Sequence, residues 1–246
     1  MTGTVHSRLK EWASLYETSE FIQGDPSWFM HQVDGALNQE VLAFITSCLS
    51  YGSRSQFLPK VQQLLDWSGP KVHDWVLRGG FREHLNRDDK RCFYRLNTCS
   101  DIYIFLDTYK GILEVDGSLG EYVRNSGAST GLEAVKAICS RFGGAGGLVP
   151  KDASSACKRV CMFLRWMVRD GSPVDLGLWS GFIDKRTLII PMDTHVLSEA
   201  CKLGLVRSRT ASMSAAIKLT SALATVFPED PLKGDFALFG YGVSGF

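Results

Sequence analysis

Lys158 and Asp193 are the two residues whose types and positions best suit chemistry on a carbon centre. Lys158 follows Ser154-Ser155-Ala156-Cys157, and Asp193 lies in the segment Ile190-Pro191-Met192-Asp193-Thr194-His195-Val196-Leu197. A deprotonated lysine amine can attack carbon and form a Schiff base. A carboxylate can stabilise positive charge that develops in a transition state. These two residues are therefore the first candidates for a functional site.

The segment around Asp193 predicts that this carboxylate lies at the start of a helix. Pro191 favours an extended approach, and an aspartate at the following turn can accept a backbone N–H as an N-cap. The helix is indicated by apolar residues at helical spacing, namely Val196, Ala200, Leu203 and Leu205, and Gly204 suits its end. A plain structural cap, which contributes about 1 kcal/mol, is the alternative to a catalytic role.

Lys158 is predicted in the first turn of another helix, where the positive end of the helix macrodipole disfavours an ammonium group. One explanation is a DNA phosphate held at the helix start, and the other is a nucleophilic amine. The same helix has an apolar stripe made of Val160, Phe163, Leu164 and Met167. The opposite side, for which a solvated face is expected, carries Lys158, Met162, Arg165 and Arg169.

The elements that hold these residues are predicted to be helices, because helical periodicity dominates and strand-like alternation is scarce. We therefore expect an all-α protein. The predicted helices cover about 6–17, 38–51, 55–67, 71–85, 100–114, 118–126, 130–142, 155–169, 194–204, 213–226 and 231–242. The glycine-rich stretch 143–147 predicts a hinge or hairpin; it lacks the Lys-Ser/Thr ending of a phosphate-binding loop.

Composition leaves several classes of protein open and excludes others. The 246 residues carry a net charge of +1, and residues 146–210 hold ten Lys/Arg against six Asp/Glu, which leaves +4 there and −3 elsewhere. This mild excess fits a solvated face as well as a nucleic-acid surface. No long apolar run or signal-peptide pattern occurs, and the seven scattered cysteines predict reduced thiols without structural zinc. We expect a soluble cytoplasmic protein.

The sequence resembles the helix-hairpin-helix DNA glycosylase superfamily. The match is carried by Lys158, by the segment PMDTHVL around Asp193, by VLAFITSCLSYGSRS (41–55) and by DFALFGYG (235–242). The run SACKRVCMFLRWMVRD also resembles a poorly characterised bacterial subgroup. The resemblance implies one all-α domain over 1–246, with two lobes around a cleft, a hairpin region at about 130–169 and the aspartate segment at 190–204.

The resemblance also implies an activity. Lys158 would attack the sugar C1′ atom to form a Schiff base, and Asp193 would stabilise the cationic transition state. The implied function is removal of a damaged base, such as an oxidised purine like 8-oxoguanine, from double-stranded DNA by a monomeric glycosylase with AP lyase activity. Many relatives carry a four-cysteine iron–sulfur loop; because no cysteine follows Cys201, we expect no cluster and no other cofactor.

Other candidate residues would contact DNA around this site. Contacts with DNA are expected from Lys151, Ser154, Ser155, Arg159, His195, Tyr51 and Arg54, of which Tyr51 is an aromatic candidate for stacking. An extruded base must be gripped by stacking, and Trp179 in the polar insertion 170–185 is the candidate for that role. Phe239 and Trp166 are expected in the core.

Two departures from the family pattern keep other functions open. No glycine lies between Pro150 and Lys158, where the usual hairpin has a Pro-Gly-x-Gly turn, and the two key residues are 193 − 158 = 35 apart, a wider spacing than usual. A noncatalytic nucleic-acid-binding protein is the second hypothesis. A helical interaction module, in which Asp193 is only a cap, is the third. Salt-dependent DNA binding argues against the third, and strand cleavage separates the first two.

Overall fold

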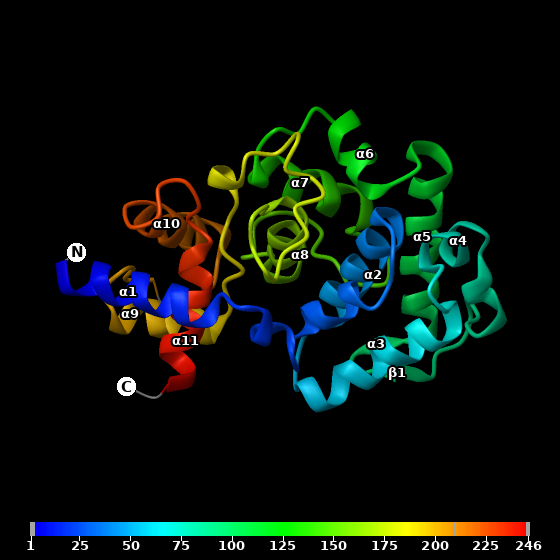
Figure 1. Cartoon of the computed structure of the whole chain (residues 1–246). Helices are drawn as coiled ribbons and strands as arrows, with labels where there is room; N and C mark the ends of the chain where they lie inside the picture. Colours follow the sequence, from blue (N-terminus) through cyan, green and yellow to red (C-terminus); the bar gives the residue numbers. More distant parts are fainter. Residues whose placement is uncertain (1–2, 209, 245–246) are drawn as a thin grey trace. The chain divides into compact units, whose positions relative to one another are not determined.

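The computed structural model describes residues 3–208 and 210–244 and is mostly helical, as the sequence predicts (Figure 1). Helices account for 61% of the structure and strands for 3%. Each of the eleven predicted helices corresponds to an α-helix in the described part of the chain. The helices belong to two compact units.

Unit 1 contains residues 1–24, 129–135 and 153–246. Its helices and short 3₁₀ turns are α1 (Gly3–Tyr16), η1 (Ser19–Ile22), α8 (Lys158–Val168), η4 (Lys185–Thr187), α9 (Thr194–Lys202), α10 (Met213–Ala224) and α11 (Lys233–Ser244). Helix α11 packs against both α1 and α9 (Figure 1). The approach of α1 is close enough that a Cβ at Gly240 would lie 2.1 Å from the Tyr16 ring.

Unit 2 contains residues 25–128 and 136–152. Its elements are η2 (Pro26–His31), α2 (Ala36–Leu49), α3 (Arg54–Ser68), α4 (Val72–Leu77), η3 (Gly80–Glu83), β1 (Cys92–Tyr94), β2 (Asn97–Thr98), α5 (Cys99–Asp116), α6 (Leu119–Asn125) and most of α7 (Gly131–Phe142). An aromatic cluster at its centre consists of Phe44, Phe105, Tyr109 and Phe142.

Unit 2 differs from the sequence-based expectation at two places. The helix predicted over 71–85 stops at Leu77, and the chain resumes as η3 after Gly79, whose φ of +73° is left-handed. The second difference is a short antiparallel hairpin of β1 and β2, which the sequence analysis did not predict. Two and three residues are too few for alternation between exposed and buried side chains to give a strand signal.

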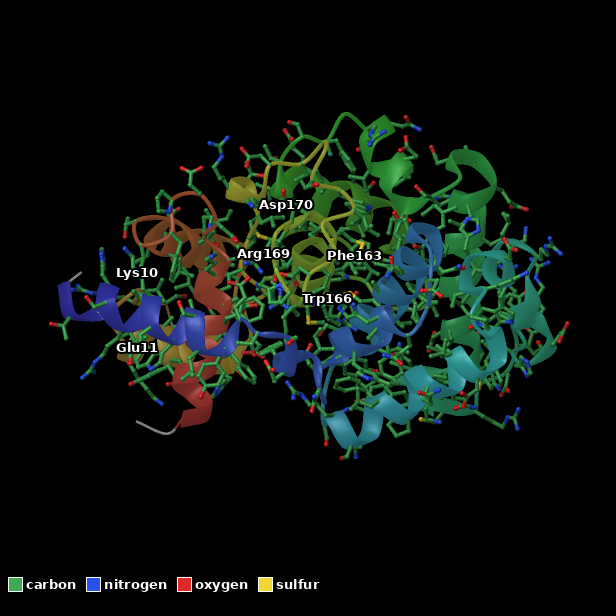
Figure 2. All side chains as sticks on the ribbon, viewed as in Figure 1. Lys10, Glu11, Phe163, Trp166, Arg169 and Asp170 are labelled. Carbon is green, nitrogen blue, oxygen red and sulfur yellow. The ribbon has the colours of Figure 1, made fainter. Side chains whose placement is uncertain are left out.

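In helix α8 the predicted apolar stripe is confirmed, but the predicted solvated face is not. Its apolar stripe, consisting of Val160, Phe163, Leu164 and Met167, is at most 1% exposed. The prediction of a solvated opposite face is wrong for Arg165 and Arg169, which are 5% and 0% exposed. Figure 2 labels Arg169, the C-cap of this helix, and Trp166 within the helix. Both guanidinium groups form ion pairs with carboxylates from other segments, which offset the cost of burying their charge.

Candidate active site

Asp193 is the N-cap of α9, as the sequence predicts. Its backbone is extended, with φ −108° and ψ −173°, and its side chain accepts the N–H of Val196 at Oδ1, 2.8 Å away. Pro191 and Met192, which precede it, are buried. The buried residues before Asp193 and the cap hydrogen bond together fix the orientation of the carboxylate. Its second oxygen, Oδ2, is left for another partner.

Lys158 supplies that partner. It is the first residue of α8, and its Nζ lies 3.0 Å from Oδ2 of Asp193. The N-cap before it, Cys157, has a left-handed φ of +45°, which is uncommon for a residue other than glycine. The side chains of Lys158 and Asp193 are 37% and 36% exposed. Two residues 35 apart in the sequence therefore meet within unit 1 at a place that solvent reaches.

The surroundings of Asp193 keep its carboxyl group ionised. Burial raises its pKa, but the ammonium of Lys158, the N–H of Val196 and the nearby His195 together outweigh burial and hold the pKa below its ordinary value. An aspartate in this state carries negative charge at neutral pH. It is suited to stabilising a developing cation and unsuited to donating a proton.

The arrangement offers one amine and one carboxylate within hydrogen-bond distance on the starts of two helices. The amine is a nucleophile only after it loses a proton. A carboxylate that stays ionised beside such an amine is able to stabilise positive charge on a nearby carbon.

Residues predicted to contact DNA near Lys158 do lie close to it in the chain fold. Ser154 and Ser155 precede α8 and are exposed, and Ser155 forms an isolated bridge with Ser212 before α10. Arg159 is the second residue of α8 and is half-buried. His195 is 57% exposed in the first turn of α9, with Nδ1 4.0 Å from Glu199. Their contact with DNA stays a prediction.

Three other predicted DNA-binding residues, Tyr51, Arg54 and Lys151, belong to unit 2. The Tyr51 hydroxyl donates to Asn97 and lies 3.2 Å from the carbonyl of Tyr94. Arg54 begins α3 and lies 3.4 Å from Asp25. Lys151 is exposed. Their contact with DNA stays a prediction.

The role assigned to Trp179 does not agree with the structure. This side chain is 3% exposed and packs against Phe163 and Phe182 at 5.2 and 5.6 Å between ring centres. A ring covered in this way has no face on which a base could stack. The segment 170–185 is predicted to be a polar insertion; Asp170, Ser180 and Gly181 are exposed in it, but its apolar side chains Val174, Trp179 and Ile183 are buried. Trp166 is fully buried, as expected.

Unit 1 contains a cluster of buried charges that was not predicted from the sequence. This buried ion network consists of Glu17, Arg165, Arg169, Asp175, Asp230 and Asp235. Arg165 pairs with Asp175 and Asp235, and Arg169 with Glu17, Asp175 and Asp230. A signal was present, since two arginines one turn apart interrupt an apolar helix, but three of the four acidic partners, Glu17, Asp230 and Asp235, lie far away in the sequence.

Neither a metal site nor a membrane segment emerges from the described residues. No group of three or more His, Cys, Asp or Glu side chains there is placed to hold a metal ion. All seven cysteines are free thiols. No helix in the described ranges is both long and apolar enough to cross a bilayer.

Comparison with known proteins gives one match. A family model described as "Protein of unknown function (DUF2400)" matches residues 25–244. No curated protein and no solved structure matches the chain. Both Lys158 and Asp193 lie within the matched region, whereas α1 precedes it.

Proposed function

The chain belongs to the DUF2400 family, and we propose that this member is a DNA N-glycosylase with AP lyase activity that removes a damaged base. The observation that carries the proposal is the 3.0 Å contact between Lys158 Nζ and Asp193 Oδ2. It agrees with the resemblance to the helix-hairpin-helix glycosylases, in which a lysine and a helix-capping aspartate act together. The proposal includes that family's two-lobed fold and cleft.

In the proposed reaction the amine of Lys158 attacks C1′ of the damaged nucleotide. The bond between C1′ and the base breaks, and the base departs with the electron pair and gains a proton. Positive charge on the sugar peaks during this step, and the ionised Asp193 stabilises it. The resulting Schiff base then permits elimination of the 3′ phosphate, which cuts the strand.

The accessibility of the pair supports this proposal over a purely structural one. A carboxylate that only capped α9 would not need an ammonium group beside it, and an exposed ion pair contributes only about 0–1 kcal/mol to stability. The two arginines of the buried ion network also come from α8 and its C-cap, but they are held out of solvent. Lys158 instead stays where a substrate reaches it.

The test is borohydride trapping on a panel of duplexes, each with one modified base. The wild-type protein should give a covalent protein–DNA adduct on at least one lesion, because borohydride reduces a Schiff base to a stable amine. Lys158→Gln should abolish the adduct, and Asp193→Asn should slow base release by about 10²-fold, since it removes one electrostatic stabiliser of the transition state.

Lys185→Gln is the matched control, because Lys185 forms another exposed lysine–aspartate pair in unit 1, 2.6 Å from Asp170. It should leave adduct formation unchanged. Adducts that persist in Lys158→Gln would assign the nucleophile to another amine. Salt-dependent DNA binding without cleavage of any lesion would replace the enzyme with a noncatalytic DNA-binding protein.

A further inference from the structure

Helix α11 contacts both helices that carry the Lys158–Asp193 pair. Asp193 caps α9, which packs directly against α11. Lys158 begins α8, and this helix reaches α11 through a side chain, because Arg165 Nη1 lies 2.5 Å from Oδ2 of Asp235 in α11. The position of the amine relative to the carboxylate therefore depends on how each of the two helices is held to α11.

The contact between α9 and α11 leaves little room for adjustment. A Cβ at Gly242 would lie 2.4 Å from Nε2 of His195, which is closer than real Cβ atoms come to other side chains. His195 is two residues after Asp193, so this contact holds the start of α9. The opposite neighbour of α11 is α1, whose Tyr16 ring is equally close to Gly240. Helix α11 is therefore a fixed support for the cap at Asp193.

The contact between α8 and α11 is made by buried side chains. Arg165 and Arg169 lie over the Phe236 ring, with their guanidinium carbons 4.7 and 5.3 Å from its centre. Arg165 also pairs with Asp235, and all four side chains are buried. The aromatic face attracts both cations, but a charge-assisted hydrogen bond is directional. Asp235 therefore fixes where Arg165 lies on α11.

Lys158 lies on the same side of α8 as Arg165. The two residues are seven apart in one helix, which is close to two turns and about 10 Å along the axis. Burial raises the pKa of Asp235, and the charges of Arg165, Lys158 and Arg169 oppose this rise, so Lys158 is within electrostatic reach of Asp235. A shift of Arg165 on α11 would move the Lys158 end of α8 as well.

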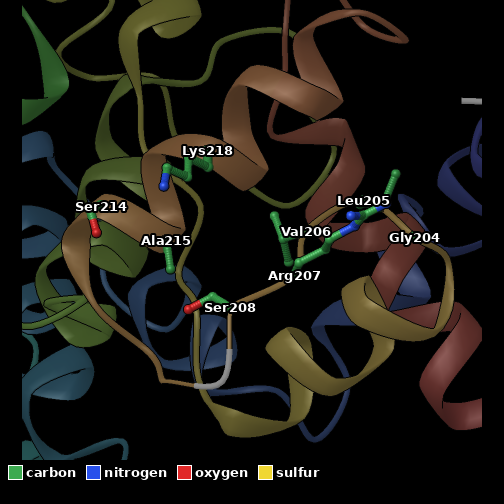
Figure 3. Close-up of a pocket in the computed structure, with 8 residues that line it drawn as sticks. All are labelled: Gly204, Leu205, Val206, Arg207, Ser208, Ser214, Ala215 and Lys218. Carbon is green, nitrogen blue, oxygen red and sulfur yellow. The ribbon is translucent and has the colours of Figure 1, made fainter.

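The acids of the buried ion network are not equivalent in this respect. Asp235 lies within α11, whereas Asp230 precedes this helix and pairs with Arg169 at the C-cap of α8. The cavity shown in Figure 3 lies between α10 and the loop after α9, and no member of the network is among its described lining residues. The network therefore connects helices and does not border that cavity.

We propose that Asp235 is a positioning residue for the Lys158–Asp193 pair: by holding Arg165 on α11, it places the Lys158 amine against the carboxylate that caps α9. The use of this placement in catalysis rests on the proposed glycosylase function, whereas the placement itself is testable without DNA.

The experiment is competitive acetylation of the folded full chain with a trace of acetic anhydride. Mass spectrometry measures the labelling of Lys158 relative to Lys185, which forms another exposed pair in the same unit. An ammonium held by a carboxylate reacts slowly, because acetylation needs the free amine. Asp235→Asn should raise the ratio about two- to fivefold, the effect of releasing an exposed ion pair. Asp193→Asn sets the ratio for a broken pair, and Asp235→Glu, which keeps the charge, should stay nearer the wild type.

Asp230→Asn is the matched control, because Asp230 is as buried as Asp235 and belongs to the same network. It should leave the labelling of Lys158 unchanged. If Asp235→Asn does not fold, the double variant Arg165→Met, Asp235→Asn tests the same contact, because it leaves no buried guanidinium without its partner. The double variant should also raise the ratio.

On a lesion duplex that the wild type traps, Asp235→Asn should bind as the wild type does but form the borohydride adduct more slowly. The proposal is overturned if the labelling of Lys158 is unchanged in the Asp235 variants. It is also overturned if Asp230→Asn raises the labelling equally, since that would show a general loosening of the unit. Raised labelling in Asp235→Asn, with no lesion trapped by the wild type, would remove the glycosylase function and keep the positioning role.

Discussion

The two ends of α8 carry ion pairs in opposite surroundings. At the first residue, Lys158 contacts one carboxylate, and more than a third of each side chain is exposed. About two and three turns later, the side chains of Arg165 and Arg169 are 6% and 1% exposed and share four carboxylates. The exposed pair can exchange its partner for a substrate. The buried network cannot do so without losing contacts between α8, α1 and α11.

The carboxyl groups at the two ends respond differently to burial. Burial is the largest influence on Asp175 and Asp235 and raises the pKa of both, although neighbouring arginines oppose it. At Asp193 burial is also the largest single influence, but Lys158, the N–H of Val196 and His195 together outweigh it, and the pKa is lowered. The balance between burial and charged partners therefore has opposite signs at the two ends of α8.

The largest effect on stability should come from disrupting the buried ion network at the end of α8. Arg169→Gln removes the guanidinium that Asp230, Asp175 and Glu17 share, and we expect a loss of about 3–5 kcal/mol in the free energy of unfolding, because buried carboxylates lose their partner. Urea unfolding measures this. Lys185→Gln, at an exposed pair, should cost less than about 1 kcal/mol. Equal losses in the two variants would remove the distinction between the buried and exposed pairs.

A smaller effect on stability is expected at the exposed end. Asp193→Ala should lower the free energy of unfolding by about 1 kcal/mol through loss of the N-cap, whereas Asp193→Asn should change it little, because asparagine caps helices equally well. The same denaturant titration compares the two variants. If asparagine proves as costly as alanine, the ion pair with Lys158 outweighs the cap in holding α9.

The smallest effect concerns the pH dependence of stability. The raised pKa of Asp235 contributes stability that is present below the unfolded value of about 3.9 and is lost as pH rises through the folded value. The lowered pKa of Asp193 contributes stability above that value, and it is lost as pH falls through the folded pKa.

Denaturant titrations at a series of pH values test both signs. Asp235→Asn should flatten the stability curve just above pH 3.9, and Asp193→Asn should flatten it just below, with the ordinary aspartate pKa of about 3.9 as the dividing point. If the Asp235→Asn variant shows the same pH dependence of stability as the wild type above this point, burial does not raise the pKa of Asp235.

The sequence by itself determined the local features of the candidate site. The cap at Asp193 depends on residues 193 to 196 alone. The apolar stripe of α8 follows from spacing within one helix, which was predicted from residue 155 and begins at Lys158. The positions of the helices also followed from periodicity, because each buries one face of a local pattern. The resemblance then paired Lys158 with Asp193, and the two side chains do meet.

Only the tertiary structure decided which charged and aromatic side chains are covered. Arg165 reaches Asp235, 70 residues away, and Arg169 reaches Glu17, 152 residues away. Trp179 lies in a segment with polar composition, yet it packs on Phe163 of α8. A helical pattern records what lies on one face of a helix, but burial depends on what distant segments place against that face.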